Sequence, residues 1–306
     1  MSFCLKPDKP LSEEIRRIVL RQLEAGSAEL TSVGDPKSDD AVHDARRRVK
    51  KVRAVIRLVQ PGRNKGFRVV DKDLHDVSRL LAPVADGRGI IATLDALAHL
   101  YRKRLPKPVV DSIRAGLLDR AAQTARQARS DHVLPTSAAT LKAERRRVKY
   151  WEMRTEGFRA LAPGIETNFR QSRKAMLAAR RRPTVEQYHE WRRLVKNHWF
   201  HLRLLASRCG YHLRADQSRL ETLDGVLGEC HNLAMLLDVL ANHSYVSRAE
   251  TARCLRVVSA YQRLLRQQAQ SFGAAIYREK PRDFVKRIRH FWKEALADHR
   301  AEGSAH

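Results

Sequence analysis

The feature that most constrains the fold is a helical segment that occurs twice in the sequence. Residues 42–50 read Val-His-Asp-Ala-Arg-Arg-Arg-Val-Lys, and residues 188–196 read Tyr-His-Glu-Trp-Arg-Arg-Leu-Val-Lys, an offset of 146 positions. The match extends to Ile-Arg-Leu at 56–58 and Leu-Arg-Leu at 202–204. Two copies are too few for a solenoid, whose stability needs roughly three or more repeats. The chain is therefore predicted to contain two similar units joined near residue 163.

The first copy of the repeat has the apolar spacing of a packed α-helix. Its apolar residues are separated by steps of three and four positions: Val42, Ala45, Val49, Val52, Ile56 and Val59. Such steps place one apolar stripe, here called the seam, on one face of a helix, as is typical of helices packed in bundles. The chain has only 14 Gly and 11 Pro among its 306 residues, which disfavours a turn-rich β fold.

We therefore expect an all-α fold made of two pseudo-symmetric, antiparallel helical bundles of four-helix type in tandem. The expected divisions are an N-terminal tail (1–10), a first bundle (11–162), a second bundle (163–298) and a C-terminal tail (299–306). The pair Pro163-Gly164 is predicted to separate the bundles, and Ser12 to cap the first helix. Further helices are expected at 40–59, 67–82, 88–104, 107–130, 138–160, 165–181, 184–208, 213–229, 231–242, 247–276 and 282–297.

The charge of the chain narrows the class of partner. Lys and Arg number 60 against 34 for Asp and Glu, which gives a formal net charge of +26 at pH 7. A chain this basic repels itself unless it meets a polyanion, such as nucleic acid, an acidic membrane surface or polymeric phosphate. Of the 60 basic residues 44 are Arg, whose rigid fork of donors matches phosphate oxygens.

The sequence also carries signals of cellular location. No apolar run approaches the roughly 18 residues of a membrane span. The first ten residues contain no apolar core of a secretion signal. The four cysteines, Cys4, Cys209, Cys230 and Cys254, are scattered without a C-x-x-C pair, which fits a reducing compartment. We expect a cytoplasmic protein.

A stripe of cations lies beside the apolar seam of each repeated helix. In the first copy each member follows a seam residue by one position, about 100° around the helix. Cations so placed lie where helices meet and can line a groove. Histidine can donate to a phosphate oxygen, although a structural hydrogen-bonding role remains an alternative. Arg47 and Arg193 widen the stripes, whose members are His43, Arg46, Lys50, Arg53 and Arg57 in the first copy and His189, Arg192, Lys196 and Arg203 in the second.

The two repeated segments resemble the paired signatures of the CHAD domain family, the conserved-histidine α-helical domain. The resemblance rests on residues 41–53 and 189–199 and covers about residues 10–295. It implies two helical bundles that enclose a basic channel, which binds inorganic polyphosphate. An earlier helix in each half carries two cations four positions apart, which we add to the predicted polyphosphate contacts. The full predicted set is Arg17, Arg21, His43, Arg46, Arg47, Lys50, Arg53, Arg57, Arg170, Lys174, His189, Arg192, Arg193, Lys196 and Arg203.

The sequence departs from the family pattern at three places. Members often have an Arg-Asp pair in the helix after each signature, where this chain has Ala85-Asp86 and His231-Asn232. Trp199 stands where the first copy has Arg53. Positions 85 and 231 are therefore left out of the predicted contacts.

Two other functions compete with polyphosphate binding. Nucleic-acid binding suits the charge and the arginine content, but aromatic residues, which stack on bases, are only 6% of the chain. A metal-dependent phosphohydrolase would use doublets such as His43-Asp44 and His75-Asp76, which here lie in cationic helices. Zinc binding by Cys209, His212, Cys230 and His231 is disfavoured by their spacing.

The sequence thus predicts a protein that binds polyphosphate and is not an enzyme. We expect no catalytic residue, no metal and no cofactor, with nucleic acid as a non-specific competitor. Binding of this kind would associate the protein with polyphosphate granules.

Overall fold

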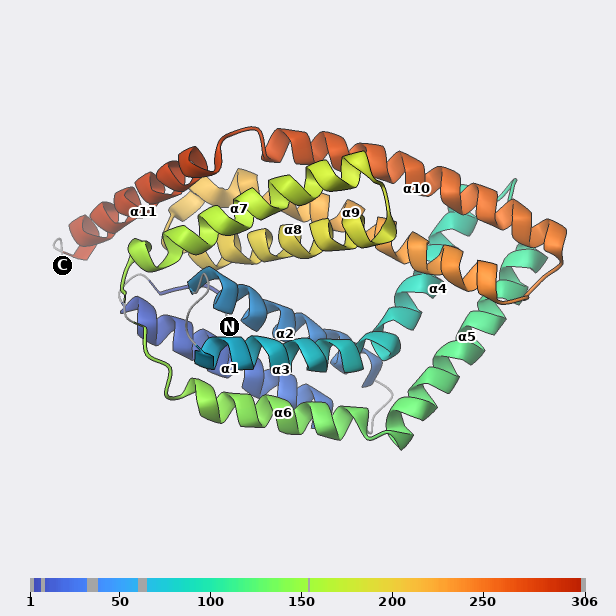
Figure 1. Cartoon of the computed structure of the whole chain (residues 1–306), viewed down its shortest axis with the longest axis horizontal. Helices are drawn as coiled ribbons and strands as arrows, with labels where there is room; N and C mark the ends of the chain where they lie inside the picture. Colours follow the sequence, from blue (N-terminus) through green and yellow to red (C-terminus); the bar gives the residue numbers. More distant parts are fainter. Residues whose placement is uncertain (1–2, 7–8, 32–37, 60–64, 154, 304–306) are drawn as a thin grey trace.

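The chain folds into helices joined by short connections. The computed structural model describes residues 3–6, 9–31, 38–59, 65–153 and 155–303. Within these ranges it contains no strand, so the expected all-α class is confirmed (Figure 1). The helices are α1 (Leu11–Thr31), α2 (Ser38–Val59), α3 (Lys65–Leu80), α4 (Ala82–Leu100), α5 (Lys107–Ser130), α6 (Val133–Val148), α7 (Phe158–Arg181), α8 (Val185–Leu205), the 3₁₀ helix η1 (Gly210–Leu213), α9 (Arg214–Asn242), α10 (Arg248–Ile276) and α11 (Pro281–Gly303).

The two copies of the repeated segment lie against each other in the middle of the molecule. They form α2 and α8, which are in direct contact. On one side α1 and α3 pack on α2, and α6 packs on α1 and α3 (Figure 1). On the other side α7 and α9 pack on α8, while α10 packs on α9 and α7, and α11 on α7. Helix α4 leaves the end of α3 and packs on α5 and α9. No described helix combines the length and apolarity needed to span a membrane.

The apolar seam of α2 is buried as its spacing predicts. Val42, Ala45, Val49, Val52 and Ile56 are all inaccessible to solvent or nearly so. Burying such side chains stabilises the fold by about 0.8 kcal/mol for each CH₂ group. The cluster to which they belong extends from α1 through α8 to α11, whereas a second cluster joins α4, α5, α9 and α10. The main core therefore contains residues from both sides of the expected bundle boundary between residues 162 and 163. The division of the chain into two bundles stays a prediction.

Two contacts fix how closely α2 approaches the second half of the chain. Gly164 of α7 lies directly over the end of α2, where an added Cβ would come 1.9 Å from the carbonyl oxygen of Leu58. In the buried contact between α8 and α2, Nε2 of His201 donates to the carbonyl oxygen of Ala54 at 2.9 Å. Burial lowers the pKa of His201 to about 4, so the ring is neutral and donates through a single nitrogen.

The predicted break at Pro163-Gly164 is wrong, because both residues lie inside α7. Pro163 lacks the N–H that would bond to the carbonyl oxygen of Arg159, so α7 continues through it with one intrahelical hydrogen bond missing. Gly164 serves the close packing on α2 and not a change of chain direction. The chain turns instead at Gly157, whose φ of 65° lies in the left-handed region that favours glycine.

Three helix boundaries also differ from the expected ones. Helix α1 begins at Leu11, so Ser12 is not its cap; the Glu156 carboxylate accepts from the backbone N–H groups of Leu11 and Ser12 at 3.0 and 3.2 Å. Helix α9 is continuous where two helices, 213–229 and 231–242, were expected. Helix α6 ends at Val148 and not near 160, and Trp151 beyond it stacks on Phe67 of α3 with ring centroids 4.1 Å apart.

The contact of Gly164 with α2 predicts a matched pair of stability effects. Gly164→Ala should lower the free energy of unfolding by about 1–3 kcal/mol, because the new methyl group meets a backbone oxygen that cannot rotate away. Gly225→Ala in α9, where an added Cβ meets nothing within 4 Å, should raise it by roughly 0.5–1 kcal/mol. Denaturant unfolding measures both, and equal stability of the two variants would contradict the described packing.

Candidate anion-binding site

Two adjoining cavities lie where α2 and α8 meet. One cavity is bordered by α3, has a volume of about 500 Å³ and is here called the α3 cavity. The other is bordered by α4, has a volume of about 450 Å³ and is called the α4 cavity. The two share three lining residues, Lys50, Arg192 and Lys196. The α3 cavity is lined in addition by Arg53, Arg57, His75, Ser78, Arg79, Ala82, His189, Arg193 and Asn197, and the α4 cavity by Asp40, His43, Arg46, Arg47, Ala85, Asp86, Arg88, Gly89, Ala92, His231 and Asn232.

The position of the cations follows from their place beside the seam. Arg46, Lys50 and Arg53 each follow a buried seam residue of α2 and are half-buried. Arg192 and Lys196 flank the buried Trp191 and Val195 of α8 in the same way. Because both seams enter one core, the flanking cations of the two helices are directed toward the same space.

Lys50 shows the electrostatic cost of this arrangement. Its pKa is lowered from 10.5 to about 7, chiefly by burial and then by the charges of Arg46, Arg192 and Lys196. Asp86 opposes the shift without cancelling it. Among the residues that the structure describes, no ion pair engages Lys50, so its ammonium group is poorly neutralised.

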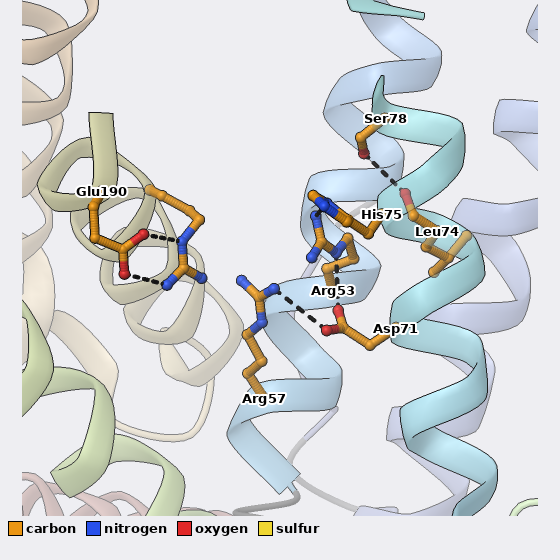
Figure 2. A network of polar contacts seen from close by, with 8 residues as sticks. Arg53, Arg57, Asp71, Leu74, His75, Ser78 and Glu190 are labelled. Atoms are coloured by element: carbon orange, nitrogen blue, oxygen red, sulfur yellow. Dashed lines mark hydrogen bonds and ion pairs between the residues drawn. The ribbon is translucent and has the colours of Figure 1, made fainter. Parts of the chain in front are cut away.

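Carboxylates hold some of the other cations in place. Asp71 of α3 accepts from Nε of Arg53 at 2.8 Å and from Nη2 of Arg57 at 3.3 Å (Figure 2). Burial alone would raise the pKa of Asp71, but the two arginines lower it overall. In the same way Asp86 of α4 accepts from Arg46 at 2.7 Å. These contacts fix the directions in which the guanidinium groups point.

The ion pairs of α8 are distributed differently. Lys196 donates to Asp224 of α9, and Arg193 is held by Glu190 of its own helix at 2.5 Å. Figure 2 shows Glu190 across from Arg57, whose guanidinium group is bound to Asp71. The charge of Arg57 helps to lower the pKa of Glu190, after the hydrogen bond from Arg193.

Arg192 and His231 form the α9 side of the cavity wall. Burial lowers the pKa of Arg192, and Gly228 of α9 leaves room for its guanidinium, since an added Cβ there would lie 3.4 Å from Nη2. The rings of His231 and His189 have centroids 5.1 Å apart. Burial, followed by the charge of Arg192, lowers the pKa of His231 to about 4, so it is neutral at pH 7.

The structure brings ten of the fifteen predicted contacts to the two cavities. They are His43, Arg46, Arg47, Lys50, Arg53, Arg57, His189, Arg192, Arg193 and Lys196.

The other five, Arg17, Arg21, Arg170, Lys174 and Arg203, line neither cavity. Arg17 is held by Glu14 at 2.6 Å, and Arg170 approaches Glu166 at 3.9 Å. Arg203 lies over the ring of Trp199, 4.8 Å from its centroid. In each of these three pairs, the partner lies three or four positions earlier on the same helix and directs the basic side chain.

Several lining residues were not among the predicted contacts. His75 and Arg79 are four positions apart on α3 and therefore on one face of that helix. Their spacing is visible in the sequence. However, this pair of residues has no counterpart in the second half of the chain that would have drawn attention to it. Ala85 and His231 stand where the family pattern has Arg, and both line the α4 cavity, so these two departures lie in the cavity wall.

The described residues contain no group of three or more His, Cys, Asp or Glu side chains placed to hold a metal ion. Two of the cysteines considered for zinc, Cys209 and Cys230, are buried, and burial raises the pKa of each thiol to about 12. Metals bind the thiolate, which is disfavoured at both positions.

Comparison with known proteins places this geometry in a family. A family model described as "CHAD domain" matches residues 17–241. The chain belongs to the CHAD domain family. The fold of this CHAD domain is similar to that in the crystal structure of the CHAD domain from the plant Ricinus communis, with a TM-score of 0.50, 18% sequence identity and 95% of each chain covered. No curated protein matches the sequence.

The depressed pKa of Lys50 predicts unusual reactivity for an amine in this CHAD domain. The neutral amine attacks the carbonyl carbon of a small acylating reagent and displaces its leaving group, so the labelling rate of Lys50 should rise through a pH of about 7 and level off above it. Mass spectrometry of peptides labelled over a range of pH measures this rate, with the exposed Lys142 of α6 as the internal reference. A rate for Lys50 that climbs with pH in parallel with that of Lys142 would show that the cavity does not destabilise its charge.

Proposed function

We propose that this CHAD domain binds inorganic polyphosphate, without hydrolysing it, in the two adjoining cavities between α2 and α8. The observation that carries the proposal is the wall shared by both cavities, where Lys50, Arg192 and Lys196 are held close together. Asp224 engages Lys196, but Lys50 and Arg192 have lowered pKa values because burial and neighbouring cations are incompletely balanced. An anion that enters between them relieves this repulsion.

A polymer suits the site better than a single phosphate. The cations of α2 from His43 to Arg57 extend over about 21 Å of helix, since each residue adds 1.5 Å. They line two cavities that meet at Lys50, so a ligand in only one cavity leaves the other unneutralised. A chain that carries charge on every unit can pass through both and accept hydrogen bonds from several guanidinium groups.

The lining also favours a chain of phosphates over nucleic acid. Single-stranded nucleic acid is usually bound by aromatic side chains on which the bases stack. Among the described residues that line the two cavities there is no Phe, Tyr or Trp. Trp199, which could have provided a platform, is covered by Lys196 and Arg203 at 5.2 and 4.8 Å from the ring centroid.

The carboxylates of the site support binding without hydrolysis. Asp71 and Asp86 each accept hydrogen bonds from arginine, and the two arginines that donate to Asp71 lower its pKa. A general base should instead have a pKa near the working pH. These carboxylates therefore serve to position cations. A protein that binds in this way would be retained on polyphosphate granules in the cytoplasm.

The shared wall predicts which charges matter for binding. The triple variant Lys50→Gln/Arg192→Gln/Lys196→Gln should bind long-chain polyphosphate at least a hundredfold more weakly, because each lost charge-assisted hydrogen bond costs on the order of 1.5–3 kcal/mol before screening. The log of affinity should also fall less steeply with log salt, since fewer counterions are released. Titration at several salt concentrations measures both quantities.

The matched control is Arg170→Gln/Lys174→Gln/Arg203→Gln, which removes the same net charge from residues that line neither cavity. It should bind nearly as the parent does. If both triple variants lose affinity equally, binding follows net charge and the cavities are not the site. Release of orthophosphate by the parent protein would contradict the absence of hydrolysis.

A further inference from the structure

A second basic surface lies on α10, apart from the residues that line the central cavities. A cavity of about 980 Å³ lies between α10 and the turn that follows α4. A neighbouring cavity of about 670 Å³ lies between α10, the end of α7 and the start of α8. The two share Arg263 and Arg266, and we call them together the α10 groove. Its other cations are Lys103, Arg104, Arg253, Arg256 and Arg180.

The cations of the groove are arranged along one face of a helix. Arg253, Arg256 and Arg263 are separated by three and then seven positions, which brings them to the same side of α10. From Arg253 to Arg266 the helix rises about 20 Å at 1.5 Å per residue. This length is close to that of the cationic stripe of α2.

Aromatic contacts hold the two ends of the groove together. Tyr101 at the end of α4 packs edge-on against Tyr261 of α10, with ring centroids 5.9 Å apart, and so brings Lys103 and Arg104 beside α10. At the other end the Arg266 guanidinium lies 4.7 Å from the ring centroid of Tyr188.

Arg266 is thereby fixed where the two cavities meet. Its Nη1 donates to the carbonyl oxygen of Pro183 at 2.8 Å, while its buried Nε has no hydrogen-bond partner among the described residues. A guanidinium that is already ordered loses little entropy when an anion binds.

The groove differs from the central cavities in lacking carboxylates. No Asp or Glu occurs among the described residues that line it, and none of its seven cations forms an ion pair within the described ranges. The nearest acidic residue in the sequence of α10, Glu250, is committed to the start of the helix, where it accepts from the backbone N–H of Ser247 at 3.0 Å. An anion that binds in the groove therefore has no internal carboxylate to displace.

We infer that the α10 groove is a second binding surface for a phosphate polymer, independent of the central cavities, so that one chain holds two polymer segments at once. The inference rests on the proposed function for the identity of the polymer. Among the lining residues described, the groove has a single aromatic side chain, Tyr188, which is buried beneath Arg266 and offers no platform for bases. Two separate sites raise the affinity for a long polymer because the second contact becomes intramolecular.

The experiment is a calorimetric titration with tripolyphosphate, which is too short to bridge two sites. The parent should bind at least two molecules per chain, one or more of them in the groove. The groove variant Arg253→Gln/Arg256→Gln/Arg263→Gln should bind fewer molecules than the parent, and its apparent affinity for long-chain polyphosphate should fall at least tenfold. The control variant Arg126→Gln/Arg129→Gln/Arg146→Gln removes the same charge from exposed residues of α5 and α6 that line neither the groove nor the central cavities, and it should bind as many molecules as the parent.

Each alternative has its own result. If the groove variant binds as many tripolyphosphate molecules as the parent, the inference is overturned. It is also overturned if the variant loses affinity only for single-stranded RNA, which would make the groove a nucleic-acid surface. If the central variant Lys50→Gln/Arg192→Gln/Lys196→Gln binds as many tripolyphosphate molecules as the parent, the proposed function is overturned and the groove stands. All three groove arginines are exposed, so the melting temperature should not change; if it falls, the single variant Arg256→Gln replaces the triple.

Discussion

The burial of two apolar seams in one core is the constraint on which the rest of the structure depends. Once the seams of α2 and α8 enter the same cluster, the cations one position beyond each seam residue have to share the space between the helices. The close crossing at Gly164 and the hydrogen bond from His201 to Ala54 keep that space narrow. Cations held in a partly buried space repel one another more strongly than in water. The pKa of Lys50, lowered to about 7, reflects its burial first and that repulsion second.

The carboxylates show how the fold tolerates this charge without cancelling it. Asp71 fixes Arg53 and Arg57, and Asp86 fixes Arg46, while Lys50 stays without an ion pair in the part of the chain that the structure describes. The site is thus ordered before any ligand arrives and retains an excess of positive charge. The α10 groove holds a similar density of arginine without paired carboxylates, because water and salt screen its exposed guanidinium groups.

Periodicity and repetition account for the parts of the fold and site that could be predicted. The steps of three and four in α2 identified its buried face, and the offset of 146 identified α8 as its counterpart. Every member of the two stripes except Arg203 lines one of the two cavities. The errors arose where long-range packing overrides local signals. Pro163 and Gly164 resemble a chain break but lie inside α7, where Gly164 packs against Leu58. Glu156 caps a helix that begins 145 positions earlier in the chain. The α10 groove could not be predicted, since its lining comes from three helices, α7, α8 and α10, and from the turn after α4, with no repeated motif.

The central claim is that the wall shared by the two cavities binds a chain of phosphates. A crystal structure of the protein with bound long-chain polyphosphate tests it most directly. The account predicts continuous density for phosphates that passes from the α3 cavity to the α4 cavity, with oxygens within hydrogen-bond distance of Lys50, Arg192 and Lys196. Density confined to the outer surface, with Lys50 and Arg192 untouched, would contradict it.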